Sequence, residues 1–486
     1  MSGKRNKWLR SVLNGCAFDD FLNPPGWGVV ESRGGISLTS RFSTNVKLNI
    51  PIVSANMDTV TGARMAIAIA KQGGLGVIHR YLNIEDQCAK IREVKRAESF
   101  VIKEPYEINP GASVGEARDL MQKNKVGGLV VVDQNKRLVG MLSGRDVRFC
   151  GDDARVVKRM TPIDNLKYGF LSTTLEEAKK IIDTHRLEKL PLIDKGTGRL
   201  LGLITAKDIE SIERHPLANK DEKGQLVVGA AIGATGDYLE RAAELIRTDA
   251  DVIVLDIANA QSVVGEKAVR EFRKRFPDFE LVVGNIVLSG AVKKYQTLGA
   301  NGLKVGLGPG SACTTRKNTN IGVPQAQAIF ECSVDAEIPI CADGGVKRNG
   351  HFGLALLLGA DSVMAGGTFA GTDETPGLVF RNSEGRKVKR FRGMASREAM
   401  YEKLRAEETD DPYEISSRIS PEGMEKEVEY RGPVVPIVKE IVGHLSSMVS
   451  YLGARNLKEA KGIFMADPAR YLVKLSEAAK KESFDR

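Results

Sequence analysis

Residues 306–325, with the sequence GLGPGSACTTRKNTNIGVPQ, combine the side chains that nucleophilic chemistry requires. The glycines and the proline allow a tight backbone turn whose amides and carbonyls can face a ligand. Cys313 lies in this turn, with Thr315 and Arg316 close by. A thiol beside hydroxyl groups and a cation is placed to ionise and to attack an electrophilic atom. The same spacing also fits an unreactive cysteine in a glycine-rich turn, so local chemistry leaves both interpretations open.

Two glycine pairs, Gly344–Gly345 and Gly366–Gly367, each follow a short apolar segment. Backbone amides of such turns can bind phosphate when the turns lie side by side at one edge of a sheet. Asp343 precedes the first pair, where its carboxylate could accept from ribose hydroxyls or simply form the turn. Together with Ser311, these residues predict a phosphate site with an adjoining ribose contact.

A long polar stretch from Glu374 to Gly432 contains RGMAS (392–396) and SPEG (420–423). So long a stretch without a clear strand–helix unit is uncommon unless it covers a site, and loops of this kind act as flaps that exclude water. Glu422, between Pro421 and Gly423, could deliver a proton to a reacting group. In isolation, a glutamate in a turn is more often an exposed surface residue.

Eight short apolar segments alternate with helical stretches; they are residues 51–55, 74–79, 226–231, 252–256, 280–285, 302–306, 338–343 and 361–366. Continuous apolar runs of this length are typical of parallel strands covered on both faces. We therefore predict an α/β protein with a (β/α)8 TIM barrel, in which active sites lie at the carboxyl ends of the strands. The candidate residues fall at those ends, as do Asn56–Asp58, His79–Arg80, Asp256–Asn259 and Gly284–Asn285.

Two stretches in the first half of the chain, starting at Ser113 and Thr174, repeat each other. Each reads as an amphipathic helix, two strands joined by a turn, and the start of another helix. We predict a paired module at 98–217, inserted between barrel parts at 1–97 and 218–486. The repeats end in Ser143-Gly-Arg-Asp146 and Thr205-Ala-Lys-Asp208. Such helix starts offer amides to a phosphate and a carboxylate to a ribose, or serve as simple helix caps.

Composition excludes several classes of protein. The 486 residues, 42% of them hydrophobic, suit a globular chain of two or three domains. Charges interrupt every apolar run, which argues against a membrane span, and the basic N-terminus lacks the apolar core of a secretion signal. Six cysteines without a CxxC pair indicate a reducing compartment, the cytoplasm, and we expect Cys332 and Cys341 to be packing residues. The net charge of +9 is mild, and no aromatic stripe accompanies it, so we expect no nucleic-acid partner.

These motifs resemble known families. The repeat pair is similar to a tandem CBS (Bateman) module, whose members commonly bind adenine or guanine nucleotides. GxGPGSxCTTR, DGG, NMDTV and RGMxS on an interrupted barrel resemble the IMP dehydrogenase/GMP reductase family over almost the whole chain. The resemblance implies that the thiolate attacks C2 of a purine nucleotide and that a nicotinamide cofactor exchanges hydride with the covalent intermediate.

Within this family, five details resemble the GMP reductase branch. They are the loop CTTRKNTNIGVPQ, Asn56, the Asp256–Asn259 motif, IFECS (329–333) and the absence of an Arg-Tyr pair between Met400 and Pro421, which dehydrogenases use to activate water. Two details depart from that branch: the CBS insertion, and Arg80 where reductases often have lysine. We therefore predict a GMP reductase. The alternatives are an IMP dehydrogenase that makes XMP with NAD, and a non-catalytic sensor of purine nucleotides.

The resemblance also implies roles for individual residues. Cys313, Thr315, Glu422 and Asp256 would be catalytic. The substrate would contact Ser311, Asp343, Gly344, Gly345, Gly366, Gly367, Met394, Ser396, Asn285 and Arg80. NADPH would contact Asp256, Ala258 and Asn259, and backbone carbonyls of Gly308, Gly310 and Cys313 could hold K⁺. A regulatory nucleotide would bind at Ser143, Asp146, Thr205 and Asp208. The expected assembly is a cytoplasmic homotetramer, with an octamer as the alternative.

Overall fold

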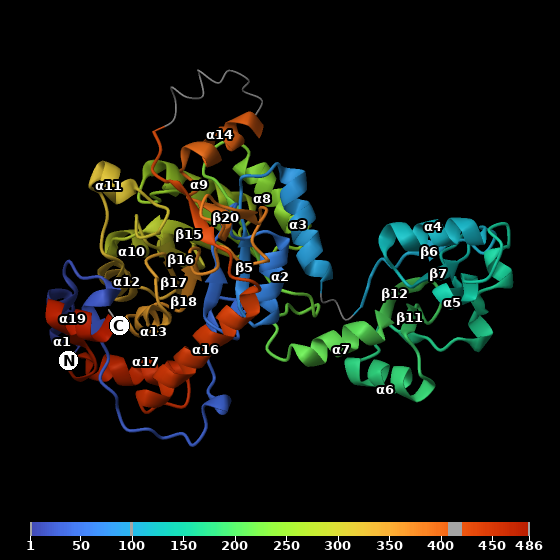
Figure 1. The fold of residues 1–486 in the computed structure, drawn as a ribbon, viewed down its shortest axis with the longest axis horizontal. Helices are drawn as coiled ribbons and strands as arrows, with labels where there is room; N and C mark the ends of the chain where they lie inside the picture. Colours follow the sequence, from blue (N-terminus) through green and yellow to red (C-terminus); the bar gives the residue numbers. More distant parts are fainter. Residues whose placement is uncertain (1, 98–100, 407–419, 485–486) are drawn as a thin grey trace. The chain divides into compact units, whose positions relative to one another are not determined.

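The chain divides into two units, each with its own hydrophobic clusters (Figure 1). The computed structural model describes residues 2–97, 101–406 and 420–484. The larger unit comprises Met1–Ala97, Leu217–Asp221 and Leu226–Arg486, and the smaller one comprises Glu98–Pro216 and Glu222–Gln225.

The larger unit contains a closed barrel of eight parallel strands, which confirms the predicted (β/α)8 fold. The strands are, in spatial order, β13 (Val228–Ile232), β14 (Val252–Asp256), β15 (Leu281–Ile286), β16 (Gly302–Val305), β17 (Ile340–Asp343), β18 (Ser362–Ala365), β4 (Ile52–Ser54) and β5 (Leu75–Ile78). Along the chain, β4 is the first strand of the barrel and β18 is the last. These two strands pair with each other, and this pairing closes the barrel.

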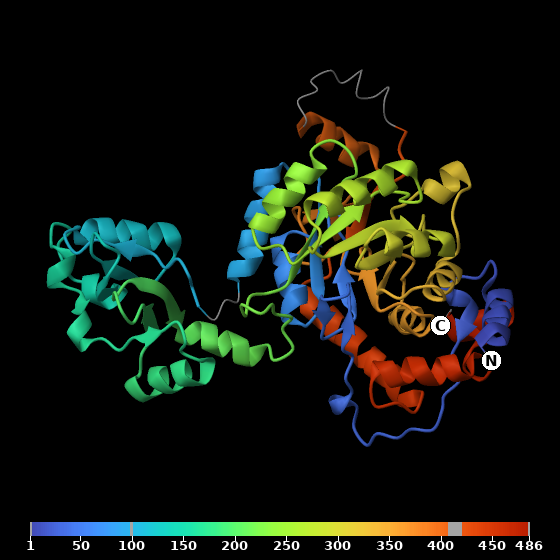
Figure 2. The same ribbon diagram turned by 180° about the vertical axis from the view of Figure 1, so that it is seen from behind.

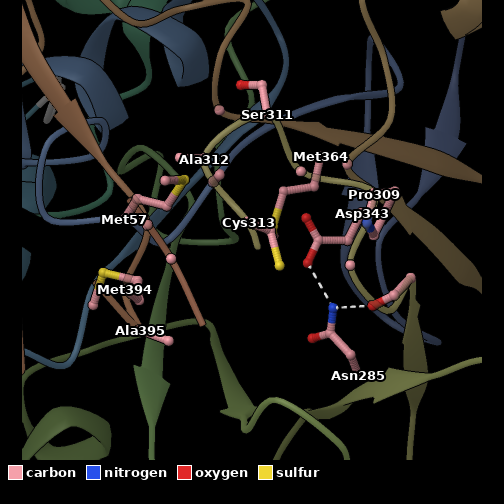
Figure 3. A pocket seen from close by; sticks show the side chains of 18 of the residues that line it. Met57, Asn285, Pro309, Ser311, Ala312, Cys313, Asp343, Met364, Met394 and Ala395 are labelled. Carbon is pink, nitrogen blue, oxygen red and sulfur yellow. Dashed lines mark hydrogen bonds between the residues drawn. The ribbon is translucent and has the colours of Figure 1, made fainter. Parts of the chain in front are cut away.

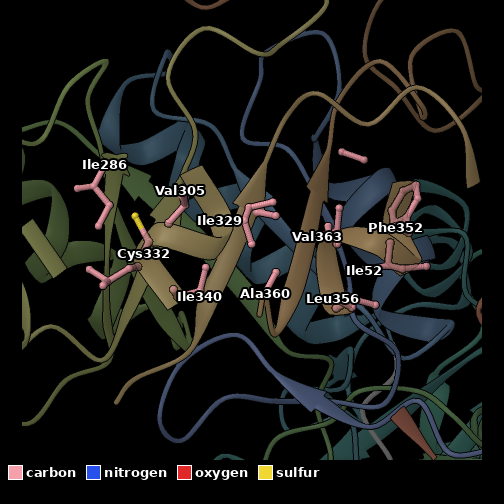
Figure 4. Close-up of a cluster of buried hydrophobic side chains, with 14 of the residues drawn as sticks. Ile52, Ile286, Val305, Ile329, Cys332, Ile340, Phe352, Leu356, Ala360 and Val363 are labelled. Atoms are coloured by element: carbon pink, nitrogen blue, oxygen red, sulfur yellow. The ribbon is translucent and has the colours of Figure 1, made fainter. Parts of the chain in front are cut away.

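Helices surround the barrel: α2 (Ala63–Lys71), α3 (Ile84–Arg96), α8 (Tyr238–Arg247), α9 (Val263–Arg275), α10 (Ser289–Thr297), α12 (Gln325–Ser333), α13 (Asn349–Leu357) and α16 (Val434–Tyr451). Side-chain caps begin two of them, where Asn83 accepts from the Asp86 amide and Ser262 from the Gly265 amide. The largest apolar cluster lies between helices and strands, with Ile329 of α12 beside Val305 and Ile340 (Figure 4).

Alternate strand residues point into the barrel and out towards the helices. Val252 and Val254 belong to the interior cluster, whereas Ile253 and Leu255 belong to the outer one. Phe42 also belongs to the interior cluster, and it follows β2 (Ser40–Arg41), which pairs with β3 (Lys47–Leu48). A Cβ atom at Gly302, where β16 begins, would meet the Phe42 carbonyl at 2.8 Å. This hairpin therefore closes the amino end of the barrel.

The polar stretch predicted as a flap contains a three-stranded antiparallel sheet of β19 (Phe380–Arg381), β20 (Lys387–Arg392) and β21 (Glu425–Glu429). Helix α14 (Arg397–Ala406) follows β20. Arg392 donates to the Asp58 carboxylate at 2.8 Å and 2.5 Å, which ties the end of β20 to the loop after β4. Most of the stretch in which we noted no Arg-Tyr pair, residues 407–419, lies outside the described residues.

The two ends of the chain lie together (Figure 2). The N-terminal part contains α1 (Ser2–Leu13), the one-turn helix η1 (Phe18–Asp20) and β1 (Phe21–Leu22). The C-terminal part contains α17 (Leu457–Ala466), α18 (Pro468–Tyr471), β22 (Val473–Lys474) and α19 (Glu477–Phe484). Strands β1 and β22 pair antiparallel.

The smaller unit consists of two halves with the same central order of elements. The first half contains β6 (Glu107–Ile108), α4 (Val114–Asn124), β7 (Gly128–Val132), β8 (Leu138–Ser143), α5 (Gly144–Val147) and β9 (Thr161–Pro162). The second contains β10 (Gly169–Phe170), α6 (Leu175–His185), β11 (Lys189–Ile193), β12 (Leu200–Thr205) and α7 (Ala206–Arg214). Capping boxes start α4 at Ser113 and α6 at Thr174. Val130 and Ile193 share an apolar cluster that joins the halves.

A search of the described helices found none with the length and hydropathy that crossing a bilayer requires.

Candidate active site

A cavity of about 300 Å³ opens at the carboxyl ends of the barrel strands (Figure 3). Residues at the ends of seven of the strands or in the loops after them line it, together with two segments of the flap, and it brings together most of the predicted site residues. These are Cys313, Thr315, Glu422, Asp256, Ser311, Asp343, Gly344, Gly345, Gly366, Gly367, Met394, Asn285, Arg80, Ala258, Gly308 and Gly310.

Cys313 lies at one end of a chain of polar contacts. Its Sγ is 3.2 Å from Thr315 Oγ1, and that hydroxyl donates to Glu422 Oε2 at 2.7 Å. Because the Thr315 hydroxyl hydrogen is directed at the carboxylate, its oxygen is free to accept the thiol hydrogen. Thr315 begins the short helix α11 (Thr315–Thr319). The three side chains thus form a relay from a thiol to a carboxylate.

Backbone contacts hold the flap directly against the cysteine loop. The Thr314 amide donates to the Glu422 carbonyl at 2.8 Å, and the Met424 amide donates to the Ala312 carbonyl at 3.0 Å. A Cβ atom at Gly393 would meet the Ala312 carbonyl at 2.7 Å, and one at Gly423 would meet the Ser396 amide at 2.9 Å. Glycine at these two positions therefore allows the approach that brings Glu422 to Thr315.

The glycine pairs form one wall of the cavity, as the sequence predicts. Gly344 and Gly345 have φ values of +84° and +77°, in the left-handed region that favours glycine. A Cβ atom at Gly367 would meet Ser311 Oγ at 2.8 Å, so the second pair touches the cysteine loop. The turns after β16, β17 and β18 therefore meet at one place, with Ser311 between them.

Lys304 is a site residue that the sequence reasoning missed. It lies in β16 with a side chain only 2% exposed, and its Nζ is 2.8 Å from Asp256 Oδ1 and 2.6 Å from Asp343 Oδ2. Asn285 donates to the same Asp343 oxygen at 3.0 Å and to the Gly306 carbonyl at 2.6 Å, as Figure 3 shows. The lysine thus joins the carboxylate at the end of β14 to the one at the end of β17. The signal that could have revealed it is a charged residue inside the apolar strand segment GLKVG (302–306).

Burial disfavours the charged forms of Lys304 and Asp256, but the ion pairs between them more than offset this effect. Burial alone would raise the pKa of Asp256, but Lys304, Arg80 and a hydrogen bond from Asn56 hold that pKa below its usual value. Burial alone would lower the pKa of Lys304, but the two carboxylates raise it above its usual value. The ammonium and the Asp256 carboxylate are therefore charged at neutral pH.

A second cavity, of about 960 Å³, shares Arg80, Tyr81, Ile257 and Ala258 with the first. Asn259, predicted to contact the cofactor, lines this second cavity and not the first. Arg80 stands in the wall common to both, and its Nε is buried without a hydrogen-bond partner among the residues that the structure describes. Two adjoining cavities suit a nucleotide and an extended dinucleotide.

The surroundings of several other predicted positions can be described. Ser396 is fully buried outside the cavity, where its Oγ accepts from the Ala399 amide at the start of α14. The Gly310 carbonyl accepts from the Cys313 amide at 3.0 Å, which leaves a lone pair for a cation. No set of three or more His, Cys, Asp or Glu side chains within the described ranges could hold a metal ion.

Burial raises the pKa of the Cys332 and Cys341 thiols to about 12, as expected for packing residues.

The predicted regulatory residues pair with each other in the smaller unit. Ser143 Oγ donates to Asp146 Oδ2 at 2.7 Å, and Thr205 Oγ1 donates to Asp208 Oδ2 at 2.6 Å. Each pair caps the start of a helix, α5 or α7. Both halves of the unit thus repeat the same hydroxyl–carboxylate contact.

Comparisons with known proteins agree with this geometry. The family model described as IMP dehydrogenase / GMP reductase domain matches residues 15–485. An inosine-5'-monophosphate dehydrogenase from Nitrosopumilus maritimus is 41% identical over 475 residues, which cover 96% of this chain and 97% of that protein. One from Aquifex aeolicus is 41% identical over 457 residues, which cover 93% of this chain and 92% of that protein.

Among solved structures, a variant of the GMP reductase from Trypanosoma brucei in complex with guanosine 5'-monophosphate has a TM-score of 0.88 and 38% identity, and the match covers 97% of this chain and 98% of that one. The same enzyme in complex with guanosine 5'-triphosphate has a TM-score of 0.78 and 34% identity, with 97% and 100% covered. The chain therefore belongs to the IMP dehydrogenase/GMP reductase family, whose members are oxidoreductases that act on purine nucleotides with a nicotinamide cofactor.

Proposed function

We propose that this protein is a GMP reductase, which catalyses GMP + NADPH + H⁺ → IMP + NH₃ + NADP⁺. The observation that carries the proposal is the relay from Cys313 through Thr315 to Glu422. It links a nucleophile to a carboxylate that can take up a proton and return it to a leaving group.

The relay accounts for both halves of the chemistry. As Cys313 adds to C2 of guanine, its thiol proton passes to Thr315 while the Thr315 hydroxyl proton passes to Glu422. The reverse transfer protonates the amino group on C2, which then leaves as ammonia. The covalent purine intermediate accepts a hydride, and the bond from C2 to Cys313 breaks as the thiolate departs.

The other polar groups hold the substrate and the cofactor. The glycine turns and Ser311 would bind the 5′-phosphate through backbone amides and a hydroxyl. Asp343 would accept from ribose hydroxyls, and Met394 would close over the base. The nicotinamide cofactor supplies the hydride, and its nicotinamide end fits the wall formed by Asp256 and Ala258, with Asn259 and the second cavity beyond it.

IMP dehydrogenase is the second candidate, because the curated relatives named above have that activity and are 41% identical. Two features of the sequence favour the reductase. The stretch from Met400 to Pro421 has no Arg-Tyr pair to activate the water that a dehydrogenase needs, and the Asp256–Asn259 motif resembles reductases. Guanosine 5'-monophosphate bound to a solved relative also agrees with this choice.

One absorbance assay distinguishes the two reactions. Purified protein is mixed with GMP and NADPH, and separately with IMP and NAD⁺, and the reduced cofactor is followed at its absorbance band. We expect oxidation of NADPH with GMP and no reduction of NAD⁺ with IMP. NAD⁺ reduction with IMP would identify a dehydrogenase, and no reaction in either mixture would favour a non-catalytic sensor. NADH replaces NADPH in a third mixture to test the cofactor preference.

Replacing the nucleophile tests the covalent step. We expect Cys313→Ser to reduce kcat by at least about 1000-fold, because a serine hydroxyl is a far weaker nucleophile than a thiolate. Cys341→Ser, at a buried cysteine in β17, is the matched control and should retain kcat. Turnover at the normal rate in Cys313→Ser would contradict the mechanism.

We also propose that the smaller unit is a CBS pair that binds purine nucleotides and regulates the barrel. Its two similar halves and their matching Ser143–Asp146 and Thr205–Asp208 contacts support this proposal. A relative has been solved in complex with guanosine 5'-triphosphate. Calorimetric titration with GTP and ATP, on the intact protein and on a Ser143→Ala/Thr205→Ala double variant, tests it. Unchanged affinity in the double variant would exclude these two caps as the binding site.

A further inference from the structure

The one-turn helix η1 carries two neighbouring aspartates that contact different parts of the molecule. Asp20 lies 2.5 Å from Lys480 Nζ on the C-terminal helix α19 and accepts from the Ala17 amide at 2.6 Å. Asp19 contacts the segment that follows β17. Its Oδ1 is 3.0 Å from His351 Nε2 and also accepts from the Arg348 guanidinium.

His351 connects Asp19 to the cavity loop. It lies in the first turn of α13 with only 4% of its surface exposed. The Lys347 amide donates to His351 Nδ1 at 3.2 Å. His351 Nε2 lies 3.0 Å from Asp19 Oδ1 and 3.3 Å from Arg348 Nε, so one ring nitrogen contacts both residues. Burial, which outweighs the Asp19 carboxylate, lowers the pKa of His351, so the ring is neutral at pH 7.

The loop that His351 holds forms part of the candidate active site. All five residues from Asp343 to Lys347 line the cavity. Gly344 and Gly345 have no side chains to anchor them, so the conformation of the loop depends on backbone contacts, such as that of the Gly344 amide with the Met364 carbonyl, and on its two ends. Lys304 and Asn285 bind Asp343 at one end. At the other end, the contact of the Lys347 amide with His351 provides the anchor.

Arg348 strengthens the same connection. Its guanidinium binds Asp19 and lies over the Phe484 ring, 3.4 Å from the ring centroid. Phe18, beside Asp19 in η1, packs against the His351 ring with centroids 5.2 Å apart. The N-terminal segment, the C-terminal helix and the start of α13 therefore meet behind the loop.

We propose that Asp19 is a positioning residue for the cavity loop Asp343–Lys347 and acts on it through His351 and Arg348, beside its direct ion pair with Lys347 at 3.8 Å. The N-terminal segment would thus determine how tightly the purine nucleotide is bound, although none of its described residues, 2–22, lines the cavity. The part of the inference that concerns nucleotide affinity rests on the proposed function.

The neighbouring aspartates provide a matched pair of variants. Asp19→Asn removes the charge that Lys347, Arg348 and His351 share, and Asp20→Asn removes a charge from the same helix without touching the loop. We expect the KM for the nucleotide to rise about 5- to 10-fold in Asp19→Asn, as the loss of one hydrogen-bonded anchor predicts. The kcat should stay within about twofold, because the relay at Cys313 is unchanged. Asp20→Asn should have the wild-type KM.

Changes at His351 test the route by which Asp19 acts. His351→Leu should raise KM as Asp19→Asn does, and His351→Gln should restore part of the affinity because its amide can donate to Asp19. Equal KM values in Asp19→Asn and Asp20→Asn, or a wild-type KM in His351→Leu, would overturn the proposal.

Hydrogen exchange gives a readout that needs no substrate. Amides of residues 344–351 should exchange faster in Asp19→Asn than in Asp20→Asn, as measured by mass spectrometry of the corresponding peptide. Unchanged exchange would overturn the inference even if the enzyme proves active on GMP. Faster exchange in a protein that turns over neither GMP nor IMP would refute the proposed function and leave the loop anchor intact.

Discussion

At the scale of single residues, the candidate site contains two sets of side chains. One is the nucleophile Cys313 with its relay, and the other is the buried ion-pair network around Lys304. Thr315 and Glu422 contact Cys313 or its partner directly, whereas Lys304 lies in the cavity wall between two carboxylates. The first set should control the rate of the chemical step. The second should control stability and the placement of the substrate, because a buried ion pair is costly to break.

Glu422→Gln should lower kcat by about 100-fold or more, the usual effect of losing a general acid or base. Glutamine preserves the hydrogen bond from Thr315 but cannot take the thiol proton. Steady-state kinetics with GMP and NADPH measure the effect. Glu427→Gln, on an exposed position of β21, is the control and should match the wild type. A kcat within twofold of wild type in Glu422→Gln would exclude the relay.

Lys304→Met should cost about 3 kcal/mol or more in unfolding free energy at pH 7, because it leaves two carboxylates near the cavity floor without their cation. The pKa of Asp256 lies below its unfolded value, so this contribution is present at neutral pH and is lost as the pH falls through the folded pKa. The difference between variant and wild type should therefore shrink below about pH 4.

Chemical denaturation at pH 7 and at about pH 3 measures this difference. Lys293→Met breaks an exposed ion pair with Asp335 and should cost less than about 1 kcal/mol. Equal losses in the two lysine variants would show that the buried network contributes no more than a surface pair.

At the scale of elements, strands and turns position the site more than helices do. The eight barrel strands lie within two residues of their predicted ends, because uninterrupted apolar runs are a strong signal for strands buried on both faces. The turns after them were predicted from glycine pairs, and the structure brings those turns together around Ser311.

Gly345→Ala tests one such turn. Its φ of +77° costs an alanine about 1–2 kcal/mol. The new Cβ atom would also lie 3.2 Å from the side chains of Gln325 and Pro309. We expect lower thermal stability and a raised KM for the nucleotide. Gly350→Ala, in α13 with open space around it, should be neutral or slightly stabilising. A wild-type KM in Gly345→Ala would show that this turn does not shape the site.

The sequence could not reveal every contact. Lys304 was hidden because a single charge in an apolar run looks like an interruption, and only the closed barrel shows the two carboxylates that receive it. Ser396 was predicted from a motif, but a serine beside a helix start can cap that helix, and the structure shows the Oγ doing so. Asp19 and His351 are far apart in sequence, so no local pattern could pair them.

At the scale of the whole molecule, the smaller unit has its own apolar clusters and enters the barrel chain between α3 and β13. Lys95 at the end of α3 binds Asp221 at 2.9 Å and Asp251 at 2.6 Å. The two points where the chain leaves and re-enters the larger unit are therefore held close together by a buried lysine.

Replacing residues 98–216 by a short glycine–serine linker should leave a folded, active barrel. The ends to be joined already lie close together, and the two hydrophobic clusters of the barrel include none of the described residues of the removed segment. We expect kcat and KM for GMP within about threefold of the full chain. A short linker between chain ends that already lie close together costs little free energy. Added GTP should change the rate of the full chain alone. A shortened protein that still responds to GTP would move the regulatory site into the barrel.

The pairing of β4 with β18 has a consequence for biosynthesis. The ribosome releases β4 and β5 early, then the complete inserted unit, and only afterwards the remaining six strands of the barrel. The insert can fold as soon as it emerges, since its partners are neighbours along the chain, whereas the ring cannot close until its final strand arrives. For most of translation, the folded insert therefore separates two unfolded parts of the barrel whose apolar strands are exposed. Chaperones must shield this nascent state.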